Sequence, residues 1–138
     1  MVVTERLSIR TKGECDIIDI TADVERIVSQ SGVDCGTVTV FISGSTAGVT
    51  TIEYEPGAVG DFREMWERLV PRDISYRHDQ RWGDGNGYSH VRASTLGPSL
   101  TVPFSNRALL LGTWQQIIIV DFDNRPRSRE IILQILGE

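Results

Sequence analysis

The sequence is poor in cysteine, histidine and methionine, with two of each among 138 residues, and it has no long apolar run. Cys15 and Cys35 are too few for a disulfide framework and do not form a CxxC pair, so we expect two reduced thiols in a cytoplasmic protein. No stretch approaches the roughly 18 apolar residues that a membrane-spanning helix needs, and the N-terminus lacks the basic-then-apolar pattern of a signal peptide. We therefore expect no membrane association.

Basic side chains are also in the minority, since 14 Lys and Arg face 19 Asp and Glu and leave a net charge of −5. No run of basic residues interrupts this acidic chain, which argues against nucleic acid as a partner. Apolar residues make up 40% and charged residues 24%, a composition typical of soluble globular proteins. The length fits one domain over residues 1–138.

Short β-rich segments separated by turns dominate the chain, and helical periodicity is rare. A helix is predicted from Thr21 to Ser31, and a second follows from apolar residues at positions 62, 65, 66, 69 and 70. Strands are predicted around residues 7–10, 17–20, 37–42, 49–54, 90–95, 99–103, 108–111, 115–122 and 130–136. This order favours an α+β domain with a largely antiparallel sheet or sandwich and two to three helices.

The run Ile117–Val120 does not alternate between apolar and polar residues. Such a run is typical of a strand that is covered on both faces. We expect helices on one face and another subunit on the other.

Residues 72–89 have almost no apolar side chains and are predicted to form a long polar loop, which in a compact domain tends to be functional. His78 is followed by Asp79, and Asp84 precedes His90 in a glycine-containing segment. Two imidazoles and carboxylates suit a divalent cation such as Zn²⁺ or Mg²⁺. The alternative is that His78 is a solvated loop residue and His90 bonds to a neighbouring strand.

Other polar residues provide further candidates. If 90–95 is a strand, Arg92 emerges beside His90 and could clamp a phosphate. Glu53 at a strand end could be a general base or a metal ligand, although a solvated face explains it as well. Ser45 and Thr46 could present hydroxyls and N–H groups to an anion, or form a simple turn. Trp114 and Gln115 open the apolar run, either as ligand contacts or as a packed turn.

Several blocks in a fixed order resemble the YjbQ-like family and extend from about residue 44 to the end. They are Gly44–Glu53, His78-Asp79, Asp84–Ser94, Leu96–Ser99, Leu111–Ile117 and Gly137-Glu138. Ordered blocks are more specific than one short motif. The resemblance implies a small α+β domain that assembles as a homotrimer with polar clefts near subunit boundaries.

The family label is secondary thiamine-phosphate synthase, a weak condensation of a hydroxymethylpyrimidine diphosphate with a thiazole phosphate. The resemblance implies site roles for His78, His90 and the residues in the matching blocks, namely Glu53, Asp79, Asp84 and Asn86. In the matching blocks, many family members have histidine where this chain has Ser45, and some related members have histidine where it has Tyr88. A serine hydroxyl is a poor zinc ligand, so these replacements would weaken a metal site.

Three hypotheses of function follow. The first is an enzyme on a small phosphorylated substrate, with His90 or His78 as acid or base, Arg92 as anion clamp, and Asp84 or Glu53 as cation ligand. The second is a non-catalytic homotrimer that binds a metal or small ligand. The third is a scaffold in which the loop merely joins strands.

Overall fold

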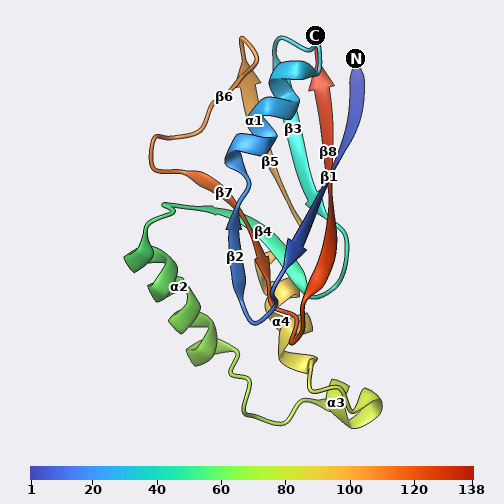
Figure 1. The fold of residues 1–138 in the computed structure, drawn as a ribbon, viewed down its shortest axis with the longest axis vertical. Coiled ribbons are helices and arrows are strands. Elements are labelled where there is room, and N and C mark those ends of the chain that lie inside the picture. Colours follow the sequence, from blue (N-terminus) through green and yellow to red (C-terminus); the bar gives the residue numbers. More distant parts are fainter.

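The computed structural model describes residues 1–138 as eight strands and four helices (Figure 1). The elements in chain order are β1 (Val2–Thr11), β2 (Asp16–Asp19), α1 (Thr21–Gln30), β3 (Gly36–Ile42), β4 (Ala47–Ile52), α2 (Pro56–Leu69), α3 (Arg77–Trp82), α4 (Gly87–Leu96), β5 (Ser99–Ser105), β6 (Ala108–Leu109), β7 (Gln116–Asp121) and β8 (Arg127–Gly137). The α+β class predicted from the sequence is confirmed.

The strands form two sheets in which every neighbouring pair is antiparallel. The larger sheet has the order β1-β8-β3-β5-β6, and the smaller has the order β2-β7-β4. Both ends of the chain lie together at the top of Figure 1, because β1 pairs along its whole length with β8. The antiparallel prediction is therefore confirmed.

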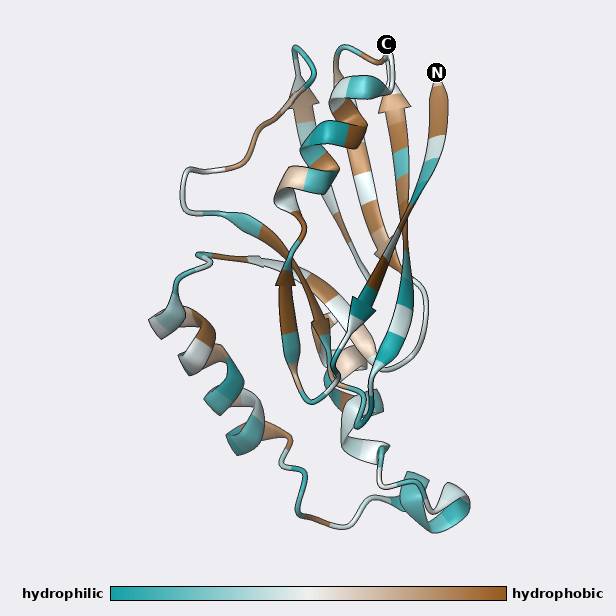
Figure 2. Cartoon of the chain, in the orientation of Figure 1, coloured by the Kyte–Doolittle hydropathy of each residue, from teal (hydrophilic) through white to brown (hydrophobic).

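Two apolar clusters hold the layers together. The larger cluster fills the space between the five-stranded sheet, α1 and one face of the smaller sheet, with Val24, Val40 and Ile119 among its buried members. The smaller cluster lies on the other face of the smaller sheet, where Trp66 of α2 and Ala93 of α4 cover it. Figure 2 shows the apolar residues concentrated along the strands, whereas α3 is hydrophilic.

Strand β7 lies between these two clusters. Ile117 and Ile119 face the larger cluster, and Ile118 and Val120 face the smaller one, all fully buried. The prediction of a strand covered on both faces is confirmed. The expected second subunit is not needed for this, since α2 and α4 of the same chain cover the second face.

Helix α2 begins earlier than its apolar periodicity predicts. The Glu55 carboxylate accepts hydrogen bonds from the N–H groups of Gly57 and Ala58 at 2.7 and 2.8 Å, and Pro56 occupies the first turn, where its missing N–H costs nothing. Of the apolar residues that defined the pattern, only Trp66 is fully buried. Leu69 is exposed, since the helix covers one edge of the smaller sheet.

The segment from residue 72 to residue 95 contains two helices where a polar loop and a strand were predicted, so the chain has four helices and not two to three. In α4, Ser89, Arg92, Ala93 and Leu96 recur at helical spacing and turn toward the protein interior. Every second residue from 87 to 95 is small or β-branched, as in a strand, but packing against β4 and β7 outweighs that local preference. No helix of the chain is long and apolar enough to cross a membrane.

Candidate functional site

The two histidines of the chain lie face to face. His78 is on α3 and His90 is on α4, and their ring centroids are 4.4 Å apart with an interplanar angle of 39°. Neither ring nitrogen of His90 bonds to another protein group, so the alternative of a strand-bonded His90 is wrong. The convergence predicted from the polar segment is present within one chain.

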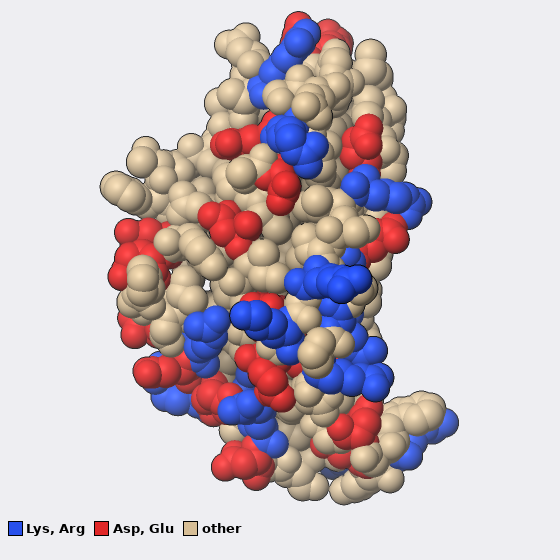
Figure 3. Space-filling view, viewed as in Figure 1, with Lys and Arg blue, Asp and Glu red and all other residues tan.

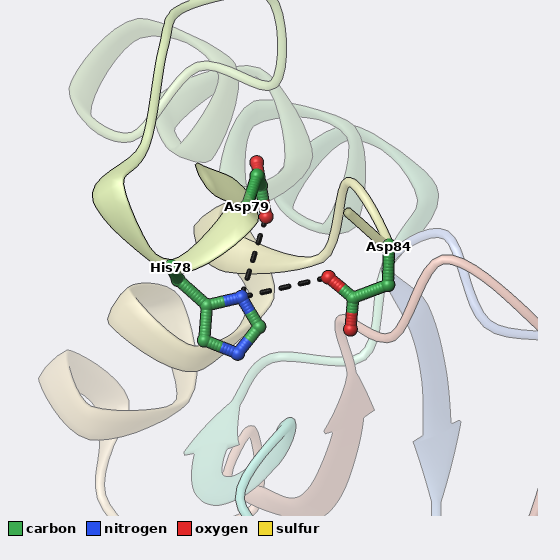
Figure 4. A group of neighbouring side chains, drawn as sticks. All are labelled: His78, Asp79 and Asp84. Carbon is green, nitrogen blue, oxygen red and sulfur yellow. Dashed lines mark hydrogen bonds and ion pairs between the residues drawn. The ribbon is translucent and has the colours of Figure 1, made fainter. Parts of the chain in front are cut away.

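Two carboxylates surround the inner nitrogen of His78. Its Nδ1 lies 3.3 Å from Oδ1 of Asp79 and 3.5 Å from Oδ1 of Asp84 (Figure 4). The three ligand atoms lie within 4.8 Å of one another. The His78 side chain is 28% exposed, so the cluster is open to solvent on one side.

Backbone geometry brings these side chains together. Gly83 ends α3 in the left-handed conformation, with a φ of 66°, and turns the chain back toward α4. Asp79 then accepts a hydrogen bond from the N–H of Gly87 at 2.8 Å. A Cβ on Gly87 would lie 2.6 Å from the Cβ of Tyr76, so only glycine allows this approach of α4 to the segment before α3.

A small hollow of about 220 Å³ adjoins His90, and no carboxylate lines it. Its walls are small residues and hydroxyls, namely Gly44, Ser45, Ala47, Ala93, Ser94 and Pro98. Ser45 is exposed there. The hollow is below the volume usual for drug-sized ligands, which favours a small ligand or one part of a larger one.

Three predicted site residues lie elsewhere. Glu53 and Trp114 line a separate pocket with Asp19 and Tyr54, beside the start of α2. Gln115 lines a groove between β4 and β5, where its amide contacts Thr51. In Figure 1 these regions lie well above α3. The structure therefore does not bring these three residues to the histidines.

Arg92 was expected beside His90 because both residues would share one face of a strand. In a helix the side chains turn by about 100° per residue, so residues two apart point to nearly opposite sides. Arg92 is 1% exposed and turns inward over the rings of Tyr88 and Phe122. The expectation of an arginine and histidine side by side is wrong, since 90–95 is helical.

A buried polar network, which sequence reasoning missed, supports the start of α4. Arg129 donates two hydrogen bonds to Asp121, at 2.7 and 2.9 Å, and one to Thr46. Asp123 accepts hydrogen bonds from Thr46 and Asn86. The predicted ligand residues Thr46 and Asn86 are thus buried and engaged within the protein. The unusual Asp-Phe-Asp after the apolar run of β7 was the available signal.

Asp123 should make stability depend on pH. Burial by itself would raise the pKa of Asp123, but hydrogen bonds from Thr46, Asn86 and Arg127 outweigh burial and lower that pKa from its ordinary value of 3.8. A carboxyl with a lowered folded-state pKa contributes stability above its unfolded value, and that contribution is lost as pH falls through the folded value. We expect the stability advantage of the natural chain over Asp123→Asn to be complete above about pH 5 and to shrink between about pH 5 and about pH 2.

Urea unfolding of both proteins across this pH range measures the effect. The exposed Asp73→Asn variant serves as the control and should keep a constant difference from the natural chain. If the difference in unfolding free energy between the natural chain and Asp123→Asn did not change with pH, the charge of Asp123 would not contribute to stability.

Comparisons with known proteins agree with this fold. The family model described as UPF0047 protein YjbQ-like matches residues 5–138. A UPF0047 protein of Methanothermobacter thermautotrophicus is 39% identical over 137 residues, covering 99% of this chain and 94% of the relative. The UPF0047 protein YugU of Bacillus subtilis is 32% identical over 133 residues, covering 95% of this chain and 97% of the relative.

A crystal structure of a YbjQ-like protein of unknown function from Sulfolobus solfataricus superimposes with a TM-score of 0.93. The two proteins are 31% identical, and the match covers 100% of this chain and 99% of the other. Sequence and fold therefore agree over the whole length, and this chain belongs to the YjbQ-like UPF0047 family.

Proposed function

We propose that His78, Asp79 and Asp84 bind a divalent cation of the zinc type. The observation that carries this proposal is the pair of distances from Nδ1 of His78 to the two carboxylate oxygens, 3.3 and 3.5 Å. Metal–ligand bonds of about 2.0–2.1 Å place ligand atoms of a tetrahedral site about 3.3–3.4 Å apart. Both distances from His78 are therefore close to the edge length of such a site, and all three ligand atoms lie within 4.8 Å of one another.

The kinds of ligand atom favour zinc or a similar transition metal over Mg²⁺, because Mg²⁺ prefers oxygen ligands and imidazole suits the transition metals. When bound, the cation would neutralise negative charge that develops on a phosphorylated substrate. Asp79 keeps its orientation through the hydrogen bond from Gly87. Such outer contacts commonly orient metal ligands.

We further propose that the site acts on a small phosphorylated molecule, with His90 as the proton-transferring group. Both nitrogens of His90 are free of protein partners, and the ring contacts His78 and also lines the hollow that contains Ser45 and Ser94. The family resemblance suggests a weak thiamine-phosphate synthase activity. In that reaction the thiazole nitrogen forms a bond to the pyrimidine methylene carbon, and the carbon–oxygen bond to diphosphate breaks. The diphosphate leaves with the bonding electrons, and a protonated His90 supplies its proton.

The non-catalytic alternative predicted from the sequence is a homotrimer that binds a metal or small ligand at the same residues. It shares the metal site and differs only in turnover, so metal binding and activity must be measured separately. Sedimentation equilibrium tests the trimer that the family resemblance suggests.

Substitution of His78 by alanine tests the metal site. Loss of an outer contact commonly weakens metal binding about 10–100-fold, so loss of a ligand should raise the dissociation constant for zinc at least about 100-fold. Isothermal titration of chelator-treated protein with zinc measures the change. Asp84→Asn should also weaken zinc binding, because it removes a negative charge from the site. This variant keeps the side-chain oxygen that accepts a hydrogen bond from the N–H of Asn86.

The matched control is Asp73→Asn, which removes an exposed carboxylate just before α3 and should leave zinc affinity unchanged. Equal zinc affinity of His78→Ala and the natural chain would exclude the proposed site. Binding of less than about 0.1 equivalent of zinc by the natural chain would exclude it as well.

A further inference from the structure

Arg92 is buried with part of its hydrogen-bonding capacity unused. Its side chain is 1% exposed, and its Nε donates to the carbonyl oxygen of Val70 at 2.9 Å. Its Nη2 has no hydrogen-bond partner, and the nearest carboxylate oxygen, Oε1 of Glu67, lies 3.4 Å away. A buried guanidinium nitrogen that makes no hydrogen bond costs stability, so its retention requires an explanation.

A pocket of about 250 Å³ lies beside Arg92, between α2, α4 and the turn from β1 to β2. Besides Arg92 it is lined by Glu14, Cys15, Arg63, Glu64, Glu67 and Arg72. Figure 3 shows acidic and basic side chains gathered closely over the lower half of the face on which α2 lies. This pocket is on the opposite side of α4 from His90, so it is separate from the proposed metal site.

The charges in the pocket balance only through its own carboxylates. Three guanidinium groups, those of Arg63, Arg72 and Arg92, line it with the carboxylates of Glu14, Glu64 and Glu67. Burial raises the pKa of the Cys15 thiol, so this group is neutral and adds no negative charge. An anion can therefore bind only by taking the place of one of these carboxylates.

Glu67 occupies the place where that anion would bind. Its Oε1 lies 2.8 Å from Nε of Arg72 and 3.4 Å from Nη2 of Arg92, so one carboxylate bridges two guanidinium groups. Guanidinium groups are well suited to bind the oxygens of carboxylates and phosphates. The Glu67 side chain is 45% exposed and lies near the end of α2, so it can swing into solvent.

The opposite wall of the pocket is a strained turn. Gly13, Glu14 and Cys15 all have positive φ angles, of 74°, 55° and 60°. Such angles are costly for residues other than glycine and concentrate at functional sites. The turn directs the Glu14 carboxylate to Nη1 of Arg72 at 2.7 Å and the Cys15 carbonyl oxygen to Nε of Arg63 at 3.1 Å. It thereby positions both partly exposed arginines at the pocket.

We propose that this pocket binds a phosphate-type oxyanion between Arg72 and Arg92, with the Glu67 carboxylate as the internal group that the ligand displaces. The proposal goes beyond the metal site and does not depend on it. The proposal predicts that substitutions of Glu67 and Arg72 change phosphate affinity in opposite directions. An ion-pair network with a purely structural role does not predict this.

The test is titration of the full, chelator-treated chain with inorganic phosphate at constant ionic strength, adjusted with chloride. Glu67→Gln keeps the size of the side chain but removes the competing charge, and it should tighten phosphate binding about tenfold. Arg72→Gln removes a charged donor and should weaken binding about tenfold or more. Phosphate should also raise the melting temperature of Glu67→Gln more than that of the natural chain.

Matched controls come from exposed charges of α2 that do not line the pocket. Asp61→Asn and Arg68→Gln each remove one such charge and should leave phosphate affinity unchanged. His90→Ala should also bind phosphate as the natural chain does. Unchanged or weaker binding by Glu67→Gln, or loss of binding in His90→Ala, would overturn the proposal.

Discussion

Replacement of Arg129 by alanine is expected to lower the free energy of unfolding by about 3–5 kcal/mol. The Arg129 side chain is 9% exposed and forms a two-bond ion pair with Asp121, which is completely buried. Removal of the guanidinium leaves the Asp121 carboxylate uncompensated and removes a donor to Thr46. Breaking a buried pair from one side is costly because the remaining charge keeps its desolvation penalty.

The control for this prediction is Arg6→Ala in the same five-stranded sheet. Arg6 pairs with Glu130, but both side chains are well exposed, at 65% and 44%. Exposed pairs contribute about 0–1 kcal/mol, so this variant should unfold nearly as the natural chain does. Urea unfolding compares the two variants directly. Similar losses in both would contradict the structural role assigned to the buried network.

Replacement of His90 by alanine is expected to slow formation of thiamine phosphate about 10²–10⁴-fold, if His90 transfers the proton to the departing diphosphate. The effect should fall on the rate of the chemical step, because His90 makes no hydrogen bond on which the fold depends. The measurement is single-turnover product formation with the zinc-loaded chain. Zinc stoichiometry of the variant shows whether His90 is a proton donor, with zinc retained, or a fourth ligand.

Val91→Ala on the same helix is the control, since Val91 is 44% exposed and turns away from the histidines. It should react at the rate of the natural chain. Equal rates for His90→Ala and the natural chain would remove His90 from the mechanism. A natural chain that binds zinc but forms no product would instead favour the non-catalytic alternative.

Helix α4 links the three regions discussed above. Ser89 turns into the buried network and donates to Asn86 and to the Phe122 carbonyl. His90 faces His78, and Arg92 faces the arginine-lined pocket. Because successive residues are rotated by about 100°, one short helix supplies residues to three separate surroundings.

Local sequence pattern was enough for most of the fold. The β-branched run of β3 and the apolar run of β7 predicted strands, and the apolar spacing around Trp66 predicted α2. These features could be predicted because periodicity reports which side of an element is buried. The proximity of His78 and His90 also followed from the polar, glycine-containing segment between them.

Residues 87–96 could not be assigned from local pattern. Every second residue there is small or β-branched, as in a strand. Which side chains are buried becomes evident only when the helix packs on the smaller sheet. The wrong assignment carried over to Arg92, whose predicted position beside His90 depended on a strand. Glu53 and Trp114 line a different pocket because distant segments meet there, which local pattern does not report.

The amino-acid sequence by itself determined the α+β class and the buried central strand, and it offered the convergence of two histidines near acidic residues as one of two open interpretations. All three depend on neighbours in the chain or on short-range periodicity. Only the tertiary structure decided that Asp121 and Arg129 form a buried pair, and that Glu67 lies between Arg72 and Arg92. The physical reason is that these contacts join distant segments, so packing, and not local preference, selects which charges meet.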